Sequence, residues 1–286
     1  MILVVDGLNR HRYTKLLDQM FELRARVFRD RLGWDVKVED GKEIDEFDAL
    51  DPAYILGLND EGRVVACVRA LQTTGPHMLS DVFSAILDGE PPLRSATIWE
   101  STRFCVDTDV LDRGTSRHSV SFATCELMVG ALEYSRDAGI TDIVTVIDPI
   151  MNRVLKRSDC APYDYLGSTT PMGKTSAMAA LLDCTDERID RVRAFAGIEG
   201  DVFADAETEA ALADDAPAQG GGADMGSLFD LVQAQPEPQP TELEQYCLDQ
   251  VAAAETDEER DAARRLAAEL CRAGMVSDRA LAAINC

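Results

Sequence analysis

Hydrophobic and polar residues follow one another along the first 198 residues in blocks that predict alternating strands and helices. Short apolar runs rich in β-branched residues are typical of strands, and apolar positions that recur every three or four residues are typical of helices. This alternation predicts an α/β sandwich for residues 1–198. Strands are expected at 2–5, 54–58, 64–71, 98–106, 140–147, 163–166 and 176–182, and helices at 16–32, 78–87, 116–137, 149–157 and 185–195.

The composition changes after residue 198. A sequence rich in Gly, Pro and acidic residues, including QAQPEPQP, predicts a flexible acidic linker over 199–240. Thr241 stands three residues before Glu244, which is the spacing of a capping box, and apolar residues then recur at near-helical intervals. A small helical C-terminal extension is therefore expected over 241–286, and its sequence indicates no role.

Net charge and cysteine spacing exclude several classes of function and indicate the cellular compartment. A net charge of −24 argues against nucleic-acid binding, which needs clustered Lys and Arg to neutralise phosphates. No apolar stretch approaches the ~18 residues of a membrane span, and no basic region precedes the apolar N-terminus. The eight cysteines are scattered, without the spacing of metal ligands or of a disulfide framework. We therefore expect a cytoplasmic protein with no membrane segment and no metal site; its oligomeric state is not indicated.

The stretch from residue 24 to residue 51 contains more charged and aromatic residues than packing of a hydrophobic core requires. Arg24 and Phe28 are four residues apart and share one helical face, and Trp34 follows Gly33, a helix-ending residue. An aromatic wall beside carboxylates suits a small organic cation. The plainer interpretation is a Phe/Trp pair in the core and a solvated acidic loop. The carboxylates concerned are Glu43, Asp45 and Asp48.

Two predicted strands carry charged residues that need partners. Arg69 stands in an otherwise apolar strand, so it must either reach solvent or pair with the preceding acids. In the strand at 98–106, strict alternation places Glu100 and Phe104 on one face and Arg103 on the other. Glu100 is a candidate general base, or else a structural ion-pair partner of Arg69 or Arg24.

Taken together, these residues resemble the LuxI-type acyl-homoserine lactone synthases. The resemblance covers about residues 1–195 and depends on the order and spacing of the residues. The family pattern has an Arg, a Phe and a Trp in its first third, then an acid cluster, an Arg on a strand, and a Glu and an Arg three residues apart. The matching residues are Arg24, Phe28, Trp34, Asp45, Asp48, Arg69, Glu100 and Arg103.

The resemblance implies a three-layer α/β sandwich similar to the Gcn5-related N-acetyltransferase fold, and an acyltransferase reaction. In the family, the amine of S-adenosylmethionine attacks a fatty acyl thioester carried by acyl carrier protein or coenzyme A. The methionine carboxylate then displaces methylthioadenosine, and the released lactone is a quorum-sensing signal. S-adenosylmethionine is a substrate, and no metal or other cofactor is implied.

The resemblance also assigns roles to individual residues. The implied catalytic residues are Glu100, Arg103, Asp45 and Arg69. The implied S-adenosylmethionine site consists of Arg24, Phe28, Trp34, Asp45, Asp48 and Arg103. Because ideal alternation separates Arg103 from Glu100, we expect a β-bulge, or a position at the rim of the site, to bring the two together.

The acyl donor is expected to use two further regions. We expect an acyl pocket among Phe104, Met128, Val146, Ile147 and Leu155. Ile147 stands where members that make 3-oxo-acyl products commonly carry Thr, so a 3-oxo substituent is not expected, although Thr145 lies one alternation away. The basic cluster in the helix at 149–157 is either a solvated face or a docking site for an acidic acyl carrier protein. Its members are Arg153, Lys156 and Arg157.

An ordinary acyl-coenzyme A N-acyltransferase that acts on another amine is the alternative function. Such enzymes bind pyrophosphate in an R-x-x-G-x-G/A turn before the long helix, and the corresponding stretch at 112–118 lacks that spacing. A catalytically inactive binding module is a third interpretation, against which the complete set of family residues argues. Saturable binding of S-adenosylmethionine separates the first function from the other two. Acyl chain length and the choice between the two acyl donors are not determined by the sequence.

Overall fold

The computed structural model describes residues 1–111, 119–172 and 175–214, with Val251, Arg264, Ala267 and Ala268 in addition. The chain divides into two compact units, Met1–Ala218 and Gln219–Cys286. The four described residues of the second unit are helical. Within the described residues, no helix is both long enough and apolar enough to cross a membrane.

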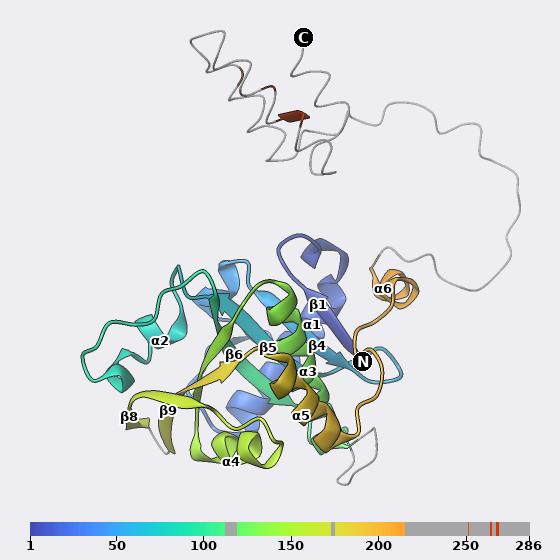
Figure 1. Cartoon of the computed structure of the whole chain (residues 1–286). Helices are drawn as coiled ribbons and strands as arrows, with labels where there is room; N and C mark the ends of the chain where they lie inside the picture. Colours follow the sequence, from blue (N-terminus) through green and yellow to red (C-terminus); the bar gives the residue numbers. More distant parts are fainter. Residues whose placement is uncertain (112–118, 173–174, 215–250, 252–263, 265–266, 269–286) are drawn as a thin grey trace, which may run out of the picture. The chain divides into compact units, whose positions relative to one another are not determined.

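A seven-stranded mixed sheet forms the middle layer of the first unit (Figure 1). Its strand order is β1-β4-β5-β6-β7-β9-β8, and all neighbours run antiparallel except β6 and β7, which run parallel. A two-stranded hairpin, β2–β3, precedes β4 along the chain. The strands are β1 (Ile2–Val5), β2 (Val38–Glu39), β3 (Lys42–Glu43), β4 (Ala53–Leu58), β5 (Val64–Gln72), β6 (Ile98–Val106), β7 (Asp142–Ile147), β8 (Asp164–Met172) and β9 (Thr175–Asp183).

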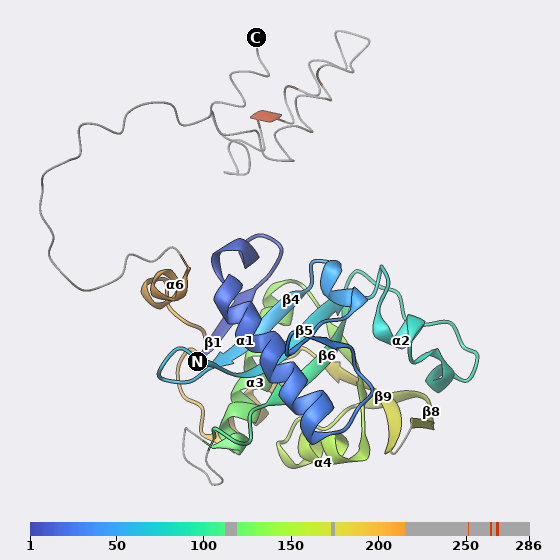
Figure 2. The same ribbon diagram turned by 180° about the vertical axis from the view of Figure 1, so that it is seen from behind.

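Helices cover both faces of this sheet (Figures 1 and 2). One face packs against α1 (Thr14–Arg24), and the other packs against α3 (Val120–Asp137), α4 (Pro149–Arg157) and α5 (Asp186–Ala196). The three-layer α/β sandwich expected from the sequence is therefore confirmed. The shorter helical segments are η1 (Arg10–Arg12), η2 (Ala25–Arg31), η3 (Glu46–Ala49), α2 (Met78–Asp81), η4 (Ser84–Leu87) and α6 (Ala206–Leu212).

Local capping chemistry sets where the helices on the second face begin. The side chain of Ser119 accepts a hydrogen bond from the Phe122 amide, and the side chain of Asp148 accepts one from the Met151 amide. Thr185 caps α5 in the same way. Each cap satisfies a backbone donor that has no partner within its own helix. The predicted starts of α4 and α5 are thereby confirmed, while residues 116–118 of the predicted long helix lie outside the described residues.

The two parallel strands separate part-way along their length. They pair from Ile98 opposite Asp142 to Ser101 opposite Thr145. Beyond that point, the remaining residues of β6 pair with β5, and those of β7 pair with β9. β6 and β7 are therefore not paired with each other at their C-terminal ends, where Arg103 lies, whereas Glu100 lies in the paired part, opposite Val144.

The predicted flexible linker differs from the structure in its first part, residues 199–214. The Ile2 amide donates to the Val202 carbonyl at 2.7 Å, and the Ala204 amide donates to the Ile2 carbonyl at 2.8 Å. Val202 is buried in the hydrophobic core. The segment is ordered because its backbone pairs with β1 and its apolar side chain is buried. Residues 215–240 and most of the predicted C-terminal extension lie outside the described residues.

Candidate active site

An aromatic pair stands at the end of the first long helix. After Arg24, the helix widens into the π-helical segment η2, and Gly33 ends it with φ at 64°. The rings of Phe28 and Trp34 stack with their centroids 5.1 Å apart and their planes at 22°. Phe28 is buried, whereas Trp34 is 41 % exposed. The aromatic wall predicted from the sequence is therefore present, and Trp34 is its accessible part.

The acidic stretch folds back onto the arginine that ends α1. Arg24 donates to both oxygens of Asp48, at 2.8 and 2.9 Å, and also bonds to Glu43. All three side chains are buried. Burial by itself lowers the pKa of Arg24, but the hydrogen bonds and charges of Asp48 and Glu43 outweigh it and raise that pKa. The network therefore holds its charges inside the protein as mutually neutralising pairs.

Arg69 joins the same network from the centre of the sheet. Its guanidinium donates to Asp48 at 2.8 Å and to Asp45 at 3.0 Å, and its Nε donates to the Thr102 hydroxyl at 3.0 Å. Burial raises the pKa of Asp48, but hydrogen bonding to Arg24 and the charges of Arg24 and Arg69 keep it below its ordinary value. The prediction that Arg69 pairs with the acids is confirmed.

A β-bulge brings Arg103 onto the same face as Glu100. Cys67 pairs with Cys105 but Arg69 pairs with Thr102, so two residues of β6 stand opposite Val68 alone. Arg103 is the strained one, with φ at 57°. Its guanidinium then reaches Glu43 at 2.9 Å and Asp45 at 2.7 Å. The predicted bulge is confirmed, and Arg103 belongs to the acid network.

The same bulge corrects the predicted position of Phe104. Strict alternation places Phe104 on the face of Glu100, but the extra residue inverts the alternation beyond Arg103. Phe104 therefore packs into the core cluster on the α3 side, while Cys105 packs on the α1 side.

Glu100 lies fully buried on β6, beneath the first residues of α2. Its two carboxylate oxygens accept hydrogen bonds from the Met78 amide at 2.6 Å and the Leu79 amide at 2.7 Å. Burial raises the pKa of Glu100 to about 7, against the opposing effects of these two bonds and of the Arg69 charge. A carboxyl group with that pKa exchanges a proton readily near neutral pH, as a general base requires. Arg24 and Arg69 pair with the acid cluster instead of with Glu100.

Met78 connects Glu100 to the rest of the site. Its amide contacts Glu100, and its sulfur lies 3.3 Å from Arg69 and 3.4 Å from Arg103. The guanidinium of Arg103 in turn lies 5.5 Å from the centre of the Phe28 ring. A candidate base, an aromatic wall and a partly accessible set of charges therefore meet on one side of the sheet.

The predicted acyl-pocket residues divide between the two faces of the sheet. Four of them, Phe104, Met128, Ile147 and Leu155, belong to the cluster beneath α3 and α4. Val146 packs on the opposite face with Leu79 and Val144. The division follows from the alternation of side chains along β7. The five residues therefore do not share one face of the sheet, and the acyl pocket stays a prediction.

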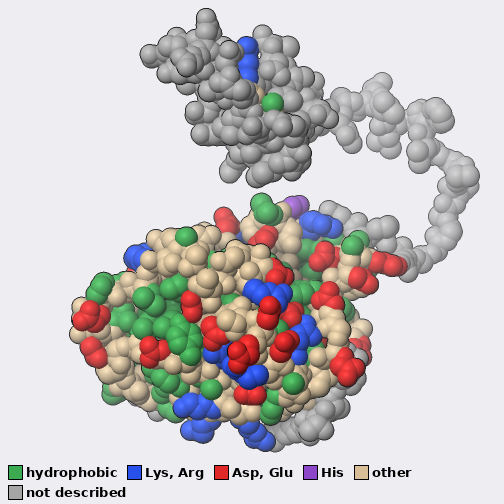
Figure 3. Space-filling model, in the orientation of Figure 1, with side chains coloured by type: hydrophobic (Ala, Val, Ile, Leu, Met, Phe, Trp, Pro, Cys, Tyr) green, Lys and Arg blue, Asp and Glu red, His purple; other side chains and the backbone are tan. Residues whose placement is uncertain are grey.

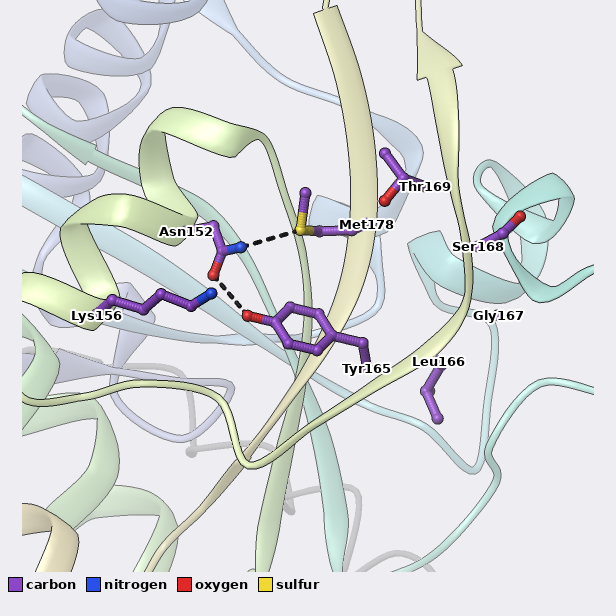
Figure 4. Close-up of a pocket in the computed structure, with 8 residues that line it drawn as sticks. All are labelled: Asn152, Lys156, Tyr165, Leu166, Gly167, Ser168, Thr169 and Met178. Carbon is purple, nitrogen blue, oxygen red and sulfur yellow. Dashed lines mark hydrogen bonds between the residues drawn. The ribbon is translucent and has the colours of Figure 1, made fainter.

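The three predicted docking residues, Arg153, Lys156 and Arg157, are exposed on α4. Figure 3 shows basic side chains at the lower edge of the molecule, where Figure 1 places α4. Lys156 also lines a surface hollow of about 280 Å³ between α4, β8 and β9 (Figure 4). There its ammonium lies 5.7 Å from the centre of the Tyr165 ring, and the Tyr165 hydroxyl donates to Asn152 at 2.8 Å.

Several residues of the site were not assigned roles from the sequence. Glu43 bridges Arg24 and Arg103, although its place in the acid cluster was visible in the sequence. Tyr54 donates to Asp48 at 2.8 Å, and Thr102 accepts from Arg69. The two amides that hold Glu100 carry no sequence signal, because backbone donors are common to nearly every residue type. The stretch 112–118, compared above with a pyrophosphate-binding turn, lies outside the described residues.

The fold and the site are those of an acyltransferase. The solved structure of MesI, described as a CoA-dependent acyl-homoserine lactone synthase, matches 72 % of this chain and 100 % of its own, with 29 % identity and a TM-score of 0.62. The structure of BjaI, described as a CoA-dependent acyl-homoserine lactone synthase with SAM and isopentyl-CoA, matches 71 % of this chain and 92 % of its own. Its identity is 26 % and its TM-score is 0.63.

Sequence comparison defines the family. The family model described as autoinducer synthase matches residues 8–192. The acyl-homoserine-lactone synthase of Agrobacterium fabrum is 39 % identical over 191 residues, which are 67 % of this chain and 90 % of the relative. This chain therefore belongs to the autoinducer synthase family.

Proposed function

We propose that this chain synthesises an acyl-homoserine lactone from S-adenosylmethionine and an acyl thioester. The observation that carries the proposal is the junction at Met78, which places the buried Glu100 beside Arg69 and Arg103, and Arg103 beside Phe28. S-adenosylmethionine carries a sulfonium, an ammonium and a carboxylate. The aromatic wall suits the first, Asp45 the second and Arg103 the third.

The proposed reaction has two bond-forming steps. The α-amine of S-adenosylmethionine is largely protonated at neutral pH, so Glu100 removes a proton from it, directly or through a water molecule. The free amine attacks the thioester carbonyl, an amide forms, and the thiol leaves. The methionine carboxylate then attacks its own γ-carbon and displaces neutral methylthioadenosine from the sulfonium. S-adenosylmethionine is thus a substrate, and the proposal needs no metal or cofactor.

The acyl donor in this proposal is acyl carrier protein or coenzyme A. The CoA-dependent relatives support the coenzyme A thioester. The exposed basic residues of α4 support a carrier protein, because the protein has a net charge of −24 and would otherwise repel an acidic partner.

Mass spectrometry of spent medium from a host that expresses this chain tests the proposed function. We expect a product bearing a homoserine lactone, and we expect it to be absent with a Glu100→Gln variant. The mass of the product also identifies the acyl chain. If folded protein gives no such product with any supplied acyl thioester and shows no saturable binding of S-adenosylmethionine, the proposal is wrong and an N-acyltransferase acting on another amine takes its place.

The activity should fall as the pH is lowered below neutral. The pKa of Glu100 is raised to about 7, so the base is increasingly protonated and inactive as the pH falls below that value. We expect kcat/KM for S-adenosylmethionine to fall by about tenfold for each pH unit below about 7. The substrate amine also titrates, so the residual activity of Glu100→Gln serves as the control. An acid limb that is identical in this variant would show that Glu100 is not its source.

Charge reversal on α4 should weaken binding of a carrier-protein donor. For a Lys156→Glu/Arg157→Glu variant, we expect KM for acyl carrier protein thioester to rise about tenfold and KM for S-adenosylmethionine to change less than about twofold. The control is Lys15→Glu/Arg63→Glu, which makes the same change in net charge at two exposed side chains elsewhere. Equal effects on both KM values, or on both variants, would contradict docking at α4.

A further inference from the structure

The loop between β5 and α2 is tied to β6 at both ends. The Thr73 hydroxyl donates to the Ile98 carbonyl at 2.7 Å and accepts from the Ser95 amide at 3.1 Å. At the other end of the loop, the Met78 and Leu79 amides bond to Glu100. The backbone donors that hold Glu100 are therefore delivered by a loop whose path depends on its own internal bonds.

His77 supplies an internal bond of this loop immediately before those donors. It is fully buried, and its Nδ1 lies 2.9 Å from the Gly75 carbonyl oxygen. A carbonyl oxygen only accepts, so Nδ1 carries the proton and donates. The same carbonyl accepts from Arg94 at 2.8 Å. Among the described residues, Nε2 of His77 has no hydrogen-bond partner, so the ring is anchored through Nδ1.

We propose that His77 is a positioning residue for Glu100: its Nδ1–H holds the Gly75 carbonyl and thereby keeps the Met78 and Leu79 amides directed at the carboxylate. This inference deepens the proposed function and rests on it for the catalytic role of Glu100. His77 itself contacts neither substrate nor reacting atoms in this proposal. Arg94 supports the same carbonyl from the solvent side.

The charged groups around Glu100 define what the loss of this positioning does. Arg69 on β5 favours the ionised carboxylate, and Asp81 on α2 disfavours it. The two amide bonds favour the ionised form as well. If the amides turn away while Arg69 and Asp81 stay, the carboxylate loses stabilisation and holds its proton to higher pH.

Two substitutions of His77 distinguish a role in positioning Glu100 from a role in packing alone. Asparagine at 77 keeps a side-chain N–H donor near the place of Nδ1, whereas leucine has no donor. We expect His77→Leu to raise the pH at which Glu100 titrates by about one unit, and His77→Asn to leave it near the wild-type value. At pH 6, kcat/KM should fall about tenfold in His77→Leu, and at pH 9 less than about twofold, with kcat changing more than KM for S-adenosylmethionine.

The titration of Glu100 is measured directly by ¹³C NMR of the full chain labelled at the glutamate carboxyl carbon. The Glu100 signal is identified by its absence in Glu100→Gln. A His77→Leu protein that is folded but titrates Glu100 at the wild-type pH would overturn the proposal, because a histidine that merely packs changes thermal stability alone. The same holds if His77→Asn and His77→Leu behave alike.

A second variant keeps the test decisive if His77→Leu does not fold. Arg94 is exposed, so Arg94→Gln is expected to fold and to shift the Glu100 titration in the same direction by a smaller amount. No shift in Arg94→Gln would then overturn the proposal. Because the NMR measurement requires no product, failure of this inference is distinguishable from failure of the proposed function, in which the wild type itself makes no lactone.

Discussion

A Glu100→Gln variant is expected to lose about 10²- to 10⁴-fold in kcat/KM for lactone formation. Glutamine has nearly the same shape as glutamate, but it cannot take up the proton that the substrate amine must lose, and general-base catalysis is worth about this factor. The buried carboxyl group, whose pKa is raised to about 7, is suited to that proton transfer near neutral pH. Steady-state assays with S-adenosylmethionine and an acyl thioester measure the effect.

The control for Glu100→Gln must separate chemistry from structure. In the wild type, two backbone amides donate to the two acceptor oxygens of Glu100. Glutamine replaces one of these oxygens with an N–H₂ group, which cannot accept a hydrogen bond, so some loss of stability is expected as well. Thermal unfolding and calorimetric titration with S-adenosylmethionine show whether the variant is folded and binds substrate. A folded variant that binds S-adenosylmethionine and retains more than about a third of the activity would exclude Glu100 as the base.

An Arg24→Met variant should lose about 3–5 kcal/mol of unfolding free energy, because it leaves Glu43 and Asp48 buried without their shared cation. The side chains of Arg24, Glu43 and Asp48 are 0 %, 1 % and 4 % exposed, so solvent does not compensate for the lost pairing. Methionine keeps most of the length of the side chain, so the lost charge and hydrogen bonds account for most of the change. Denaturant unfolding with a shared m-value measures it.

Arg29→Met is the matched control for Arg24→Met. Arg29 is five residues further along the same helical segment and pairs with Asp30, but both side chains are about half exposed. Surface ion pairs of this kind contribute little, so no measurable change in stability is expected. If the two variants are equally stable, the buried network is not a stabilising element of the fold, and its retention must be explained by substrate binding alone.

The fold and much of the site could be predicted because they depend on local patterns and on strong physical penalties. Strand and helix blocks follow from hydrophobic spacing, and α4 and α5 begin within one residue of their predicted starts. Arg69 was expected to pair with the acidic stretch because an unpaired guanidinium in an apolar strand is too costly, and it pairs with Asp45 and Asp48. The cost of burying an unpaired guanidinium predicts a carboxylate partner for Arg69 without knowledge of the fold.

The predictions that failed depend on contacts between distant segments. Phe104 was assigned to the wrong face because one extra residue in β6 inverts the alternation after Arg103. Residues 199–214 were predicted as linker because their composition is polar and acidic, yet residues 202 and 204 pair with Ile2 at the other end of the unit. The bulge of β6 opposite Val68 and the pairing of residues 199–214 with Ile2 each depend on a distant segment, so the local sequence does not show them.

The sequence by itself determined which residues are present for the chemistry: an aromatic pair, an acid cluster, two arginines and a glutamate on predicted strands, and a basic helix. Residue type and periodicity are enough for this, since they express local hydrophobicity and charge. Only the tertiary structure decided that Arg103 turns toward Glu43, that Glu43 is buried between two arginines, and that the Glu100 carboxylate is held by two amides from another segment. These features depend on bulge geometry and on burial, and both are set by packing between segments far apart in the chain.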